Sequence, residues 1–121
     1  MASIQRLNTV QDLEAILQES ARHPVFLFKH STACPVSAWA YREFQKYAMD
    51  LASQEATLAL VRVIEERPLS LEAASRLGVV HASPQVILIR EGRPVWHTSH
   101  YEASSVAMLA AIKHFYPPTK A

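Results

Sequence analysis

The sequence predicts a single α/β domain with a central mixed four- to five-stranded sheet and helices on both faces. Short apolar runs alternate with amphipathic helical runs along the chain, which gives the order α-β-α-β-α-β-β-α. A helix separates the first two strands, so they are expected to be parallel, whereas a tight turn joins the last two. The 121 residues fit one domain, 1–121, with 117–121 as a flexible tail.

The first helix is predicted over Val10 to Arg22. Thr9 precedes its amphipathic run, and Asp12 follows three residues later, which is typical of a helix N-cap. His23-Pro24 ends the helix, because the residue before a proline is pushed out of the α region.

Two apolar runs, Val25–Phe28 and Thr57–Ile64, predict strands in the middle of the sheet. The helix between them begins at Pro35, whose missing N–H would have no helical partner at that position. The apolar stripe of this helix consists of Val36, Ala40, Phe44, Tyr47, Ala48 and Leu51.

The second half of the chain predicts a short helix, a hairpin and a last helix. Pro68 opens the short helix, and Gly78 ends it where a left-handed residue is needed. The hairpin strands Val86–Ile89 and Pro94–Ser99 are joined at Glu91-Gly92. The expected apolar faces are Leu71, Ala74 and Leu77 on the short helix, and Val106, Leu109, Ile112 and Phe115 on a last helix from about Ser104 to Phe115.

The overall charge and the apolar runs limit the choice of partners and location. The formal net charge is +1, so we expect neither nucleic acid nor a membrane as a partner. No apolar stretch approaches the ~20 residues that a membrane span needs, and no signal peptide is evident at the N-terminus. One cysteine fits a reducing interior, and we therefore expect a cytoplasmic protein.

Cys34 is the sole cysteine, and it stands between an apolar strand and the proline that opens a helix. Backbone N–H groups at a helix N-terminus favour a negatively charged sulfur. Ser37 stands where a dithiol site carries its second cysteine, so any disulfide of Cys34 must be made with another molecule. The alternative is an inert, buried cysteine.

The order of elements, with Cys-Pro at a strand-to-helix junction, resembles the thioredoxin fold. Ser83-Pro84-Gln85 before a strand supports this resemblance, which implies that Pro84 is cis and faces the active-site sulfur. Dithiol thioredoxins carry a buried carboxylate on the strand before the active site, and no Asp or Glu occurs between Val25 and Ser31. This absence fits a site that does not resolve its own disulfide.

The run Lys29-His30-Ser31-Thr32-Ala33-Cys34-Pro35-Val36-Ser37 is similar to the T-C-P-I-S active site of the monothiol bacilliredoxins, the bacillithiol-system redox-active proteins of the YtxJ type. The segment Arg67-Pro68-Leu69-Ser70 also matches that family. In two departures, Ala33 replaces the usual threonine and Val36 replaces isoleucine. The resemblance implies a thiol-disulfide oxidoreductase that removes bacillithiol, a low-molecular-weight thiol, from mixed disulfides with proteins.

Under this resemblance Cys34 is the nucleophile, and its thiolate forms a mixed disulfide with bacillithiol. An external thiol or a reductase must then release it. The implied partners are S-bacillithiolated proteins, bacillithiol as thiol co-substrate and its disulfide reductase. No permanently bound cofactor and no metal are expected.

Five residues are expected to line the sulfur or stabilise its thiolate: Pro35, Val36, Ser37, Ser83 and Pro84. Pro35 would aim N–H groups at the sulfur, and Ser37 would donate its hydroxyl or its N–H. The backbone of Ser83 would pair with an extended partner chain. The alternatives are an exposed first-turn serine at Ser37 and a simple strand-entry proline at Pro84.

Four further residues are candidate contacts for the thiol ligand: Lys29, His30, Thr32 and His81. Bacillithiol bears carboxylates, so positive charge beside the site would help to bind it. The alternative is a solvated or core-edge residue, which we favour for Lys29. His81 is on a loop that should border the site. For Trp39 and Tyr41 on the second helix, core packing is the expected role.

Two other functions remain open. One is a monothiol glutaredoxin-like protein that uses another thiol or bridges an iron–sulfur cluster as a dimer. The other is a non-catalytic thioredoxin-fold binding module in which Cys34 is incidental. A histidine metal site is disfavoured, since His97 and His100 would lie on opposite faces of one strand.

Overall fold

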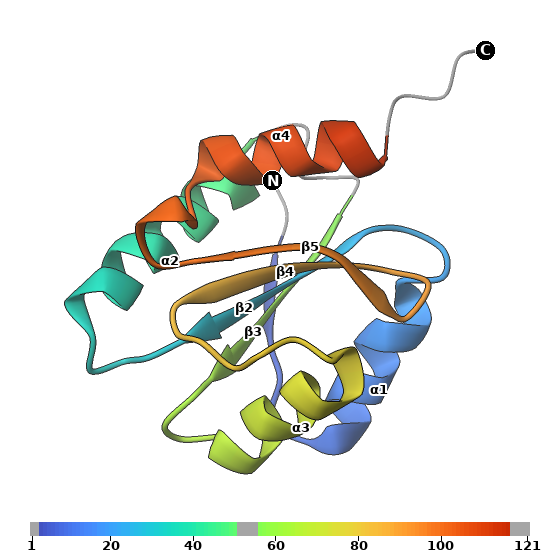
Figure 1. The fold of residues 1–121 in the computed structure, drawn as a ribbon, viewed down its shortest axis with the longest axis horizontal. Coiled ribbons are helices and arrows are strands. Elements are labelled where there is room, and N and C mark those ends of the chain that lie inside the picture. Colours follow the sequence, from blue (N-terminus) through green and yellow to red (C-terminus); the bar gives the residue numbers. More distant parts are fainter. Residues whose placement is uncertain (1–2, 51–55, 117–121) are drawn as a thin grey trace.

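The structure is a computed structural model that describes residues 3–50 and 56–116 (Figure 1). Its elements in chain order are β1 (Ile4–Arg6), α1 (Val10–Glu19), β2 (Val25–His30), α2 (Pro35–Ala48), β3 (Thr57–Arg62), α3 (Arg67–Leu77), β4 (Gln85–Arg90), β5 (Arg93–Ser99), the 3-10 helix η2 (His100–Glu102) and α4 (Ser105–Phe115). Leu51 and the predicted tail, 117–121, lie outside the described residues. Within the described ranges, no helix is both long and apolar enough to cross a membrane.

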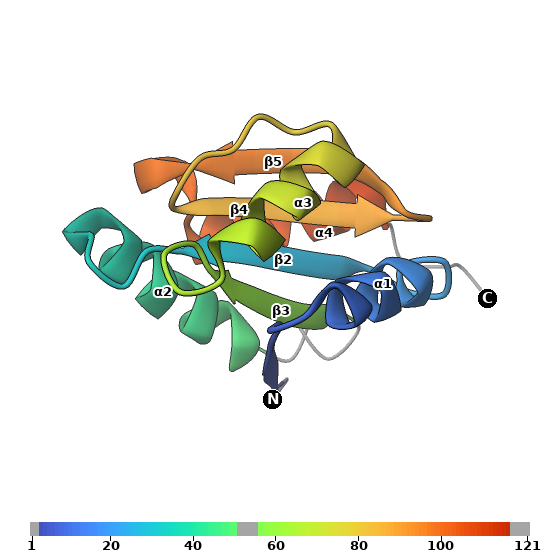
Figure 2. The same ribbon diagram turned by 90° about the horizontal axis from the view of Figure 1, so that it is seen from below.

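The five strands form one mixed sheet in the order β1-β3-β2-β4-β5. β3 runs parallel to both β1 and β2, whereas β4 runs antiparallel to β2 and β5. Helices α2 and α4 cover one face, and α1 and α3 cover the other (Figures 1 and 2). The predicted α/β class and its mixed sheet are confirmed.

The described residues contain one strand that the sequence analysis did not predict. β1 pairs with β3 from Ile4↔Leu58 to Arg6↔Leu60. It has only three residues, and Gln5 and Arg6 are exposed. A strand this short at the edge of a sheet carries too little alternation to be recognised from its own sequence.

β2 is the central strand, and its side chains enter two separate cores. Phe26 and Phe28 pack in the core under α2 and α4. Val25 and Leu27 pack in the core under α1 and α3. Burial on both faces explains why this strand is an unbroken apolar run in the sequence.

The predicted signals at helix ends and turns are confirmed, with one difference in length. Thr9 caps α1, and its hydroxyl and the Asp12 carboxylate bond each other's backbone N–H groups. α1 ends at Glu19 rather than at Arg22, because the chain tightens into i→i+3 bonds such as Arg22 N–H to Glu19 O, 2.9 Å. Gly78 is left-handed with φ +67°.

The two predicted helix faces are confirmed only in part. Leu77 on α3 and Ile112 on α4 are buried as predicted, and Leu109 and Phe115 pack partly buried against the core, whereas Leu71 and Val106 do not face it. On α4, Val106 is 71% exposed, and the buried residues are Ser105, Met108, Ala111 and Ile112. On α3, Leu71 is 43% exposed, and the buried residues are Leu69, Ser70, Ala73 and Leu77. In both helices a small residue, alanine or serine, turns toward the sheet, which lets the helix approach it closely.

Candidate active site

The end of β2, the loop before β4 and the 3-10 helix η2 lie together at one end of the sheet. The antiparallel register Lys29↔Gln85 places the start of β4 beside the end of β2. The Ser83–Pro84 peptide just before β4 is cis, as the resemblance implies. The Pro84 carbonyl accepts a hydrogen bond from the His100 N–H at 3.0 Å, so η2 borders the same loop.

Cys34 lies at the start of α2 and occupies the N-cap position, with φ −114° and ψ 123°. Its carbonyl accepts the first helical bond, from Ala38 N–H at 3.0 Å. Pro35 is the first helical residue and is exposed, and Val36 is half-buried. The N–H groups of a first helical turn have no intrahelical acceptor, so those of Val36 and Ser37 give this end of α2 its partial positive charge.

The Cys34 side chain is partly exposed. It makes no capping hydrogen bond with the part of the chain that the structure describes. Cys34 is therefore a half-buried residue at the N-terminus of a 14-residue helix.

Ser37 holds the active-site loop closed. It is fully buried, so the alternative of an exposed first-turn serine is wrong. Its Oγ accepts a hydrogen bond from the Ser31 N–H at 2.8 Å and lies 2.8 Å from His30 Nδ1. The Ser37 hydroxyl is therefore engaged by the Ser31 N–H and the His30 ring within the loop.

His30 packs against two aromatic rings. Its ring stacks on Phe28 at a centroid distance of 5.5 Å and an interplanar angle of 25°, and it contacts the tilted ring of Tyr41 at 4.9 Å and 30°. Burial lowers the pKa of His30, and the Glu65 carboxylate opposes this shift. The ring is therefore neutral at pH 7, and His30 supplies no cation to the site under those conditions.

Lys29 contradicts the sequence-based expectation most clearly. We expected a solvated or core-edge side chain, but it is fully buried, with 0% exposure. Its Nζ lies 3.2 Å from His81 Nδ1. Burial lowers the pKa of Lys29 to about 8. In this arrangement Lys29 offers no surface to a thiol ligand.

His81 is half-buried in the loop between α3 and β4. Burial, with the nearby Lys29 and Arg67 cations, lowers its pKa. It too is neutral at pH 7. His30 and His81 were two of the candidate contacts for the thiol ligand. Because both rings are neutral at pH 7, they act as polar rather than cationic groups.

Thr32 is exposed beside Cys34, and its hydroxyl donates to the Glu65 carboxylate at 3.0 Å. Glu65 in turn lies 3.9 Å from Arg62. The sequence analysis missed Glu65, which is 31 residues from Cys34 in a turn with no motif of its own.

The loop before β4 and the first residue of β4 contain buried polar atoms. Gln85 is buried, and its Nε2 donates to the Val80 carbonyl at 3.0 Å. Ser83 Oγ and Gln85 Oε1 are buried and have no hydrogen-bond partner in the described chain. The sequence analysis quoted Gln85 only as part of the Ser-Pro-Gln motif and gave it no role.

Aromatic side chains flank the start of α2. Trp39 and Tyr41 both pack against the core, as expected. The Trp39 ring also lies 5.4 Å from that of Tyr101, which is 68% exposed on η2.

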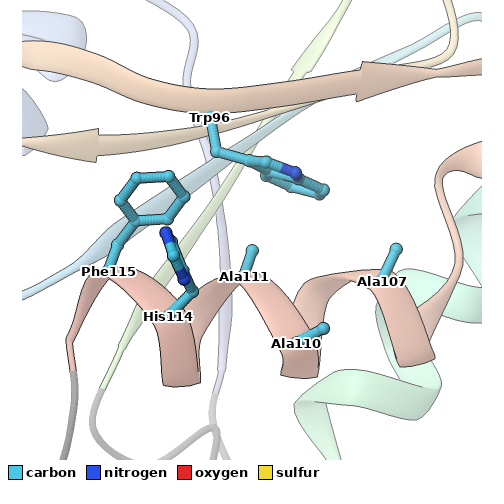
Figure 3. A pocket seen from close by; sticks show the side chains of 6 residues that line it. All are labelled: Trp96, Ala107, Ala110, Ala111, His114 and Phe115. Carbon is cyan, nitrogen blue, oxygen red and sulfur yellow. The ribbon is translucent and has the colours of Figure 1, made fainter.

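A pocket of about 410 Å³ lies between β5 and α4 (Figure 3). Its lining is apolar apart from one histidine and consists of Trp96, Ala107, Ala110, Ala111, His114 and Phe115. None of the candidate site residues contributes to it, so we do not assign the chemistry of Cys34 to this pocket.

The described residues gather no three His, Cys, Asp or Glu side chains as metal ligands. His97 and His100 are not on one strand as predicted. β5 ends at Ser99, and His100 opens η2.

A single cysteine at the N-terminus of α2, at the same end of a mixed sheet as a cis-proline, defines a thiol protein of the thioredoxin fold. The chain matches the family described as monothiol bacilliredoxin, BrxC, over residues 5–108. It therefore belongs to the monothiol bacilliredoxin family and is a thioredoxin-like oxidoreductase.

Solved structures agree with this fold. A candidate oxidoreductase with a thioredoxin fold is 30% identical, with a TM-score of 0.78 over 89% of this chain and 92% of that chain. Thioredoxin from Malassezia sympodialis (Mala s 13) is 17% identical, with a TM-score of 0.77 over 94% and 91%. Fasciola hepatica thioredoxin is 19% identical, with a TM-score of 0.74 over 91% and 97%. At these identities the two thioredoxins support the fold alone.

Proposed function

We propose that this chain removes bacillithiol from protein mixed disulfides through Cys34. The observation that carries the proposal is the position of the sole cysteine at the N-cap of α2, partly exposed, in a member of the monothiol bacilliredoxin family. The first-turn N–H groups of α2 favour a thiolate there, and the thiolate is the form that attacks disulfides.

The reaction is two successive thiol–disulfide exchanges. The Cys34 thiolate attacks the bacillithiol sulfur of a protein–bacillithiol disulfide. A new S–S bond joins Cys34 to bacillithiol, the original S–S bond breaks, and the protein leaves as a thiolate that takes a proton from solvent. A second thiol, such as free bacillithiol, then attacks the mixed disulfide, regenerates the Cys34 thiolate and departs in the new disulfide.

The surroundings of Cys34 support an external second step. Ser37 occupies the position of a resolving cysteine, and its hydroxyl is buried and bonded to Ser31 and His30. We propose that Pro35 and the N–H groups of Val36 and Ser37 stabilise the thiolate. Ser83 and cis-Pro84 face the partner, and Thr32 is the accessible polar contact for the thiol, whereas the Nδ1 atom of His81 is engaged by Lys29.

The test uses a protein with one cysteine that carries bacillithiol. Incubation with the chain should release the target thiol and leave one bacillithiol on Cys34, both detected by mass spectrometry. The Cys34→Ser variant should release nothing. Equal release by this variant, or no adduct on the natural chain, would remove the proposal.

The same assay separates the alternative functions. A target carrying glutathione in place of bacillithiol, cleared at an equal rate, would favour a protein that uses another thiol. Iron and a visible absorbance band in the purified protein would favour a cluster-bridging role. Partner binding that survives Cys34→Ser, together with slow alkylation of Cys34, would favour a binding module.

A further inference from the structure

A buried polar cluster lies on the face of the sheet covered by α1 and α3, where the surrounding strand residues are apolar. We call it the Lys29 cluster, and it consists of Lys29, Ser70, His81 and Gln85. Lys29 and Gln85 are directly opposite one another on β2 and β4. Ser70 from α3 is fully buried, and its Oγ lies 3.5 Å from His81 Nδ1. Four separate segments of the chain thus contribute to one site.

The cluster connects the strand that leads to the thiol with the loop beside it. Lys29 is five residues before Cys34, and the protonated ammonium donates to His81 Nδ1 across 3.2 Å. Gln85 holds the same loop at a second point, through the Val80 carbonyl. The segment 79–84, which ends at cis-Pro84, is therefore tied to the sheet at two successive residues.

Burying the Lys29 ammonium in this cluster costs folding free energy. A buried ammonium needs partners, and the described residues provide one hydrogen-bonding partner, a neutral imidazole. Ser83 Oγ on the loop and Gln85 Oε1 on β4 are also buried and have no hydrogen-bond partner among the residues that the structure describes. Well-packed apolar residues are often more stabilising than buried charges at such positions. Stability alone therefore does not account for a lysine at position 29.

We propose that Lys29 and His81 are positioning residues for partner recognition. Lys29 fixes His81, and His81 fixes the loop whose Ser83–Pro84 segment faces the protein bound at Cys34. This inference rests on the proposed function. Neither side chain takes part in the exchange chemistry, so their effect should fall on the binding of a protein substrate and not on the reactivity of the sulfur itself.

The test compares the natural chain with Lys29→Met, which replaces the buried cation with an apolar side chain of similar length. Lys113→Met is the control, because Lys113 is exposed on α4. Four properties are measured: the unfolding temperature, the amide exchange of residues 79–83, the rate of Cys34 alkylation by iodoacetamide, and the steady-state kinetics (kcat and KM together) with a bacillithiolated protein.

For Lys29→Met we expect a higher unfolding temperature, faster exchange in the loop and unchanged alkylation. The KM for the protein substrate should rise by about tenfold with little change in kcat, the scale of effect that a loosened binding geometry produces. A variant that is more stable yet binds its substrate less well cannot be explained by damage to the fold. Lys113→Met should change none of the four properties.

His81→Gln provides a second, conservative variant, because a glutamine amide oxygen can also accept from Lys29. It should retain most of the substrate affinity that Lys29→Met loses. The inference is overturned if loop exchange or KM is unchanged in Lys29→Met, if alkylation falls together with affinity, or if His81→Gln loses as much affinity as Lys29→Met. A natural chain that clears no bacillithiol overturns the proposed function itself, and that result is seen before any variant is compared.

Discussion

The hydroxyl of Ser37 lies 2.8 Å from the ring nitrogen Nδ1 of His30, seven residues earlier in the chain. The same oxygen accepts the Ser31 N–H. One buried hydroxyl thus joins the last residue of β2 to the first turn of α2, and the four-residue loop that carries Cys34 runs between them.

Replacing Ser37 with alanine should destabilise the protein by about 1–3 kcal/mol, because it leaves the Ser31 N–H and the His30 ring without their partner. Urea unfolding measures this loss. Ala38 is exposed beside it, and Ala38→Ser serves as the control for a hydroxyl change in the same turn. An unchanged midpoint in Ser37→Ala would show that this hydroxyl does not hold the loop.

Because of Lys29, we expect the free energy of unfolding to depend on pH in the alkaline range. The folded-state pKa of about 8 lies below the ordinary 10.5. Between these values the unfolded chain keeps a proton that the folded chain has released, so this group makes stability rise with pH from about 8 to about 10.5. Below pH 8 both states are protonated, and the full cost of burying the charge remains.

Lys29→Met should remove this dependence. We expect the variant to be more stable than the natural chain at neutral pH, by an amount on the order of 1–4 kcal/mol, and this difference should shrink as the pH rises through about 8. Urea unfolding of both proteins over that range gives the difference directly and cancels the titration of other groups. A constant difference would contradict a buried ammonium.

His30 should make the free energy of unfolding depend on pH in the acidic range. Its folded pKa is lowered by burial, so below about 6.5 the unfolded chain takes up a proton that the folded ring refuses. Stability should fall as the pH drops through that range and stop falling, for this group, below the folded pKa. His81 shifts in the same direction.

An NMR titration of the ring protons measures the His30 pKa directly, and the His30→Phe variant should lose part of the acid dependence. If the His30 ring titrates at or above its ordinary value, burial against Phe28 and Tyr41 is not what controls its charge.

Glu65 places a negative charge beside the site through its bond with Thr32. Because bacillithiol is anionic, Glu65→Gln should raise the rate of exchange with a bacillithiolated protein. The gain should not exceed about fivefold, since exposed charges interact by about 1 kcal/mol or less in water. It should also diminish at high salt. Glu72→Gln, on the outer part of α3, is the matched control, and a salt-independent change would rule out a simple charge effect.

Local signals in the sequence were sufficient for most of the fold. The apolar run of β2, the proline at the start of α2 and the left-handed Gly78 each reflect a requirement of the backbone at that position. The same holds for Cys34, because a cysteine before an N1 proline can be recognised from two adjacent letters. What these features share is that their cause lies within a few residues.

The features that were missed depend on distant residues. The apolar run seemed to end at Phe28, yet β2 continues for two residues because β3 and β4 supply partners for Lys29 and His30. The burial of Lys29 requires His81, 52 positions away. Likewise, which side of α4 faces the sheet is decided by packing, and Val106 competes with Met108 for that side on equal terms in the sequence.

The position of Cys34 makes its thiol a probe of how the chain folds. The turn that holds it is closed by β2 and α2, and the neighbouring cis-proline comes from the distant second half, tied to η2. No short fragment contains all of these parts. Since the chain has one cysteine, the rate at which its thiol is labelled can report assembly of the whole domain, from a freely accessible thiol in the nascent polypeptide to the environment that exists once both helical layers have packed on the sheet.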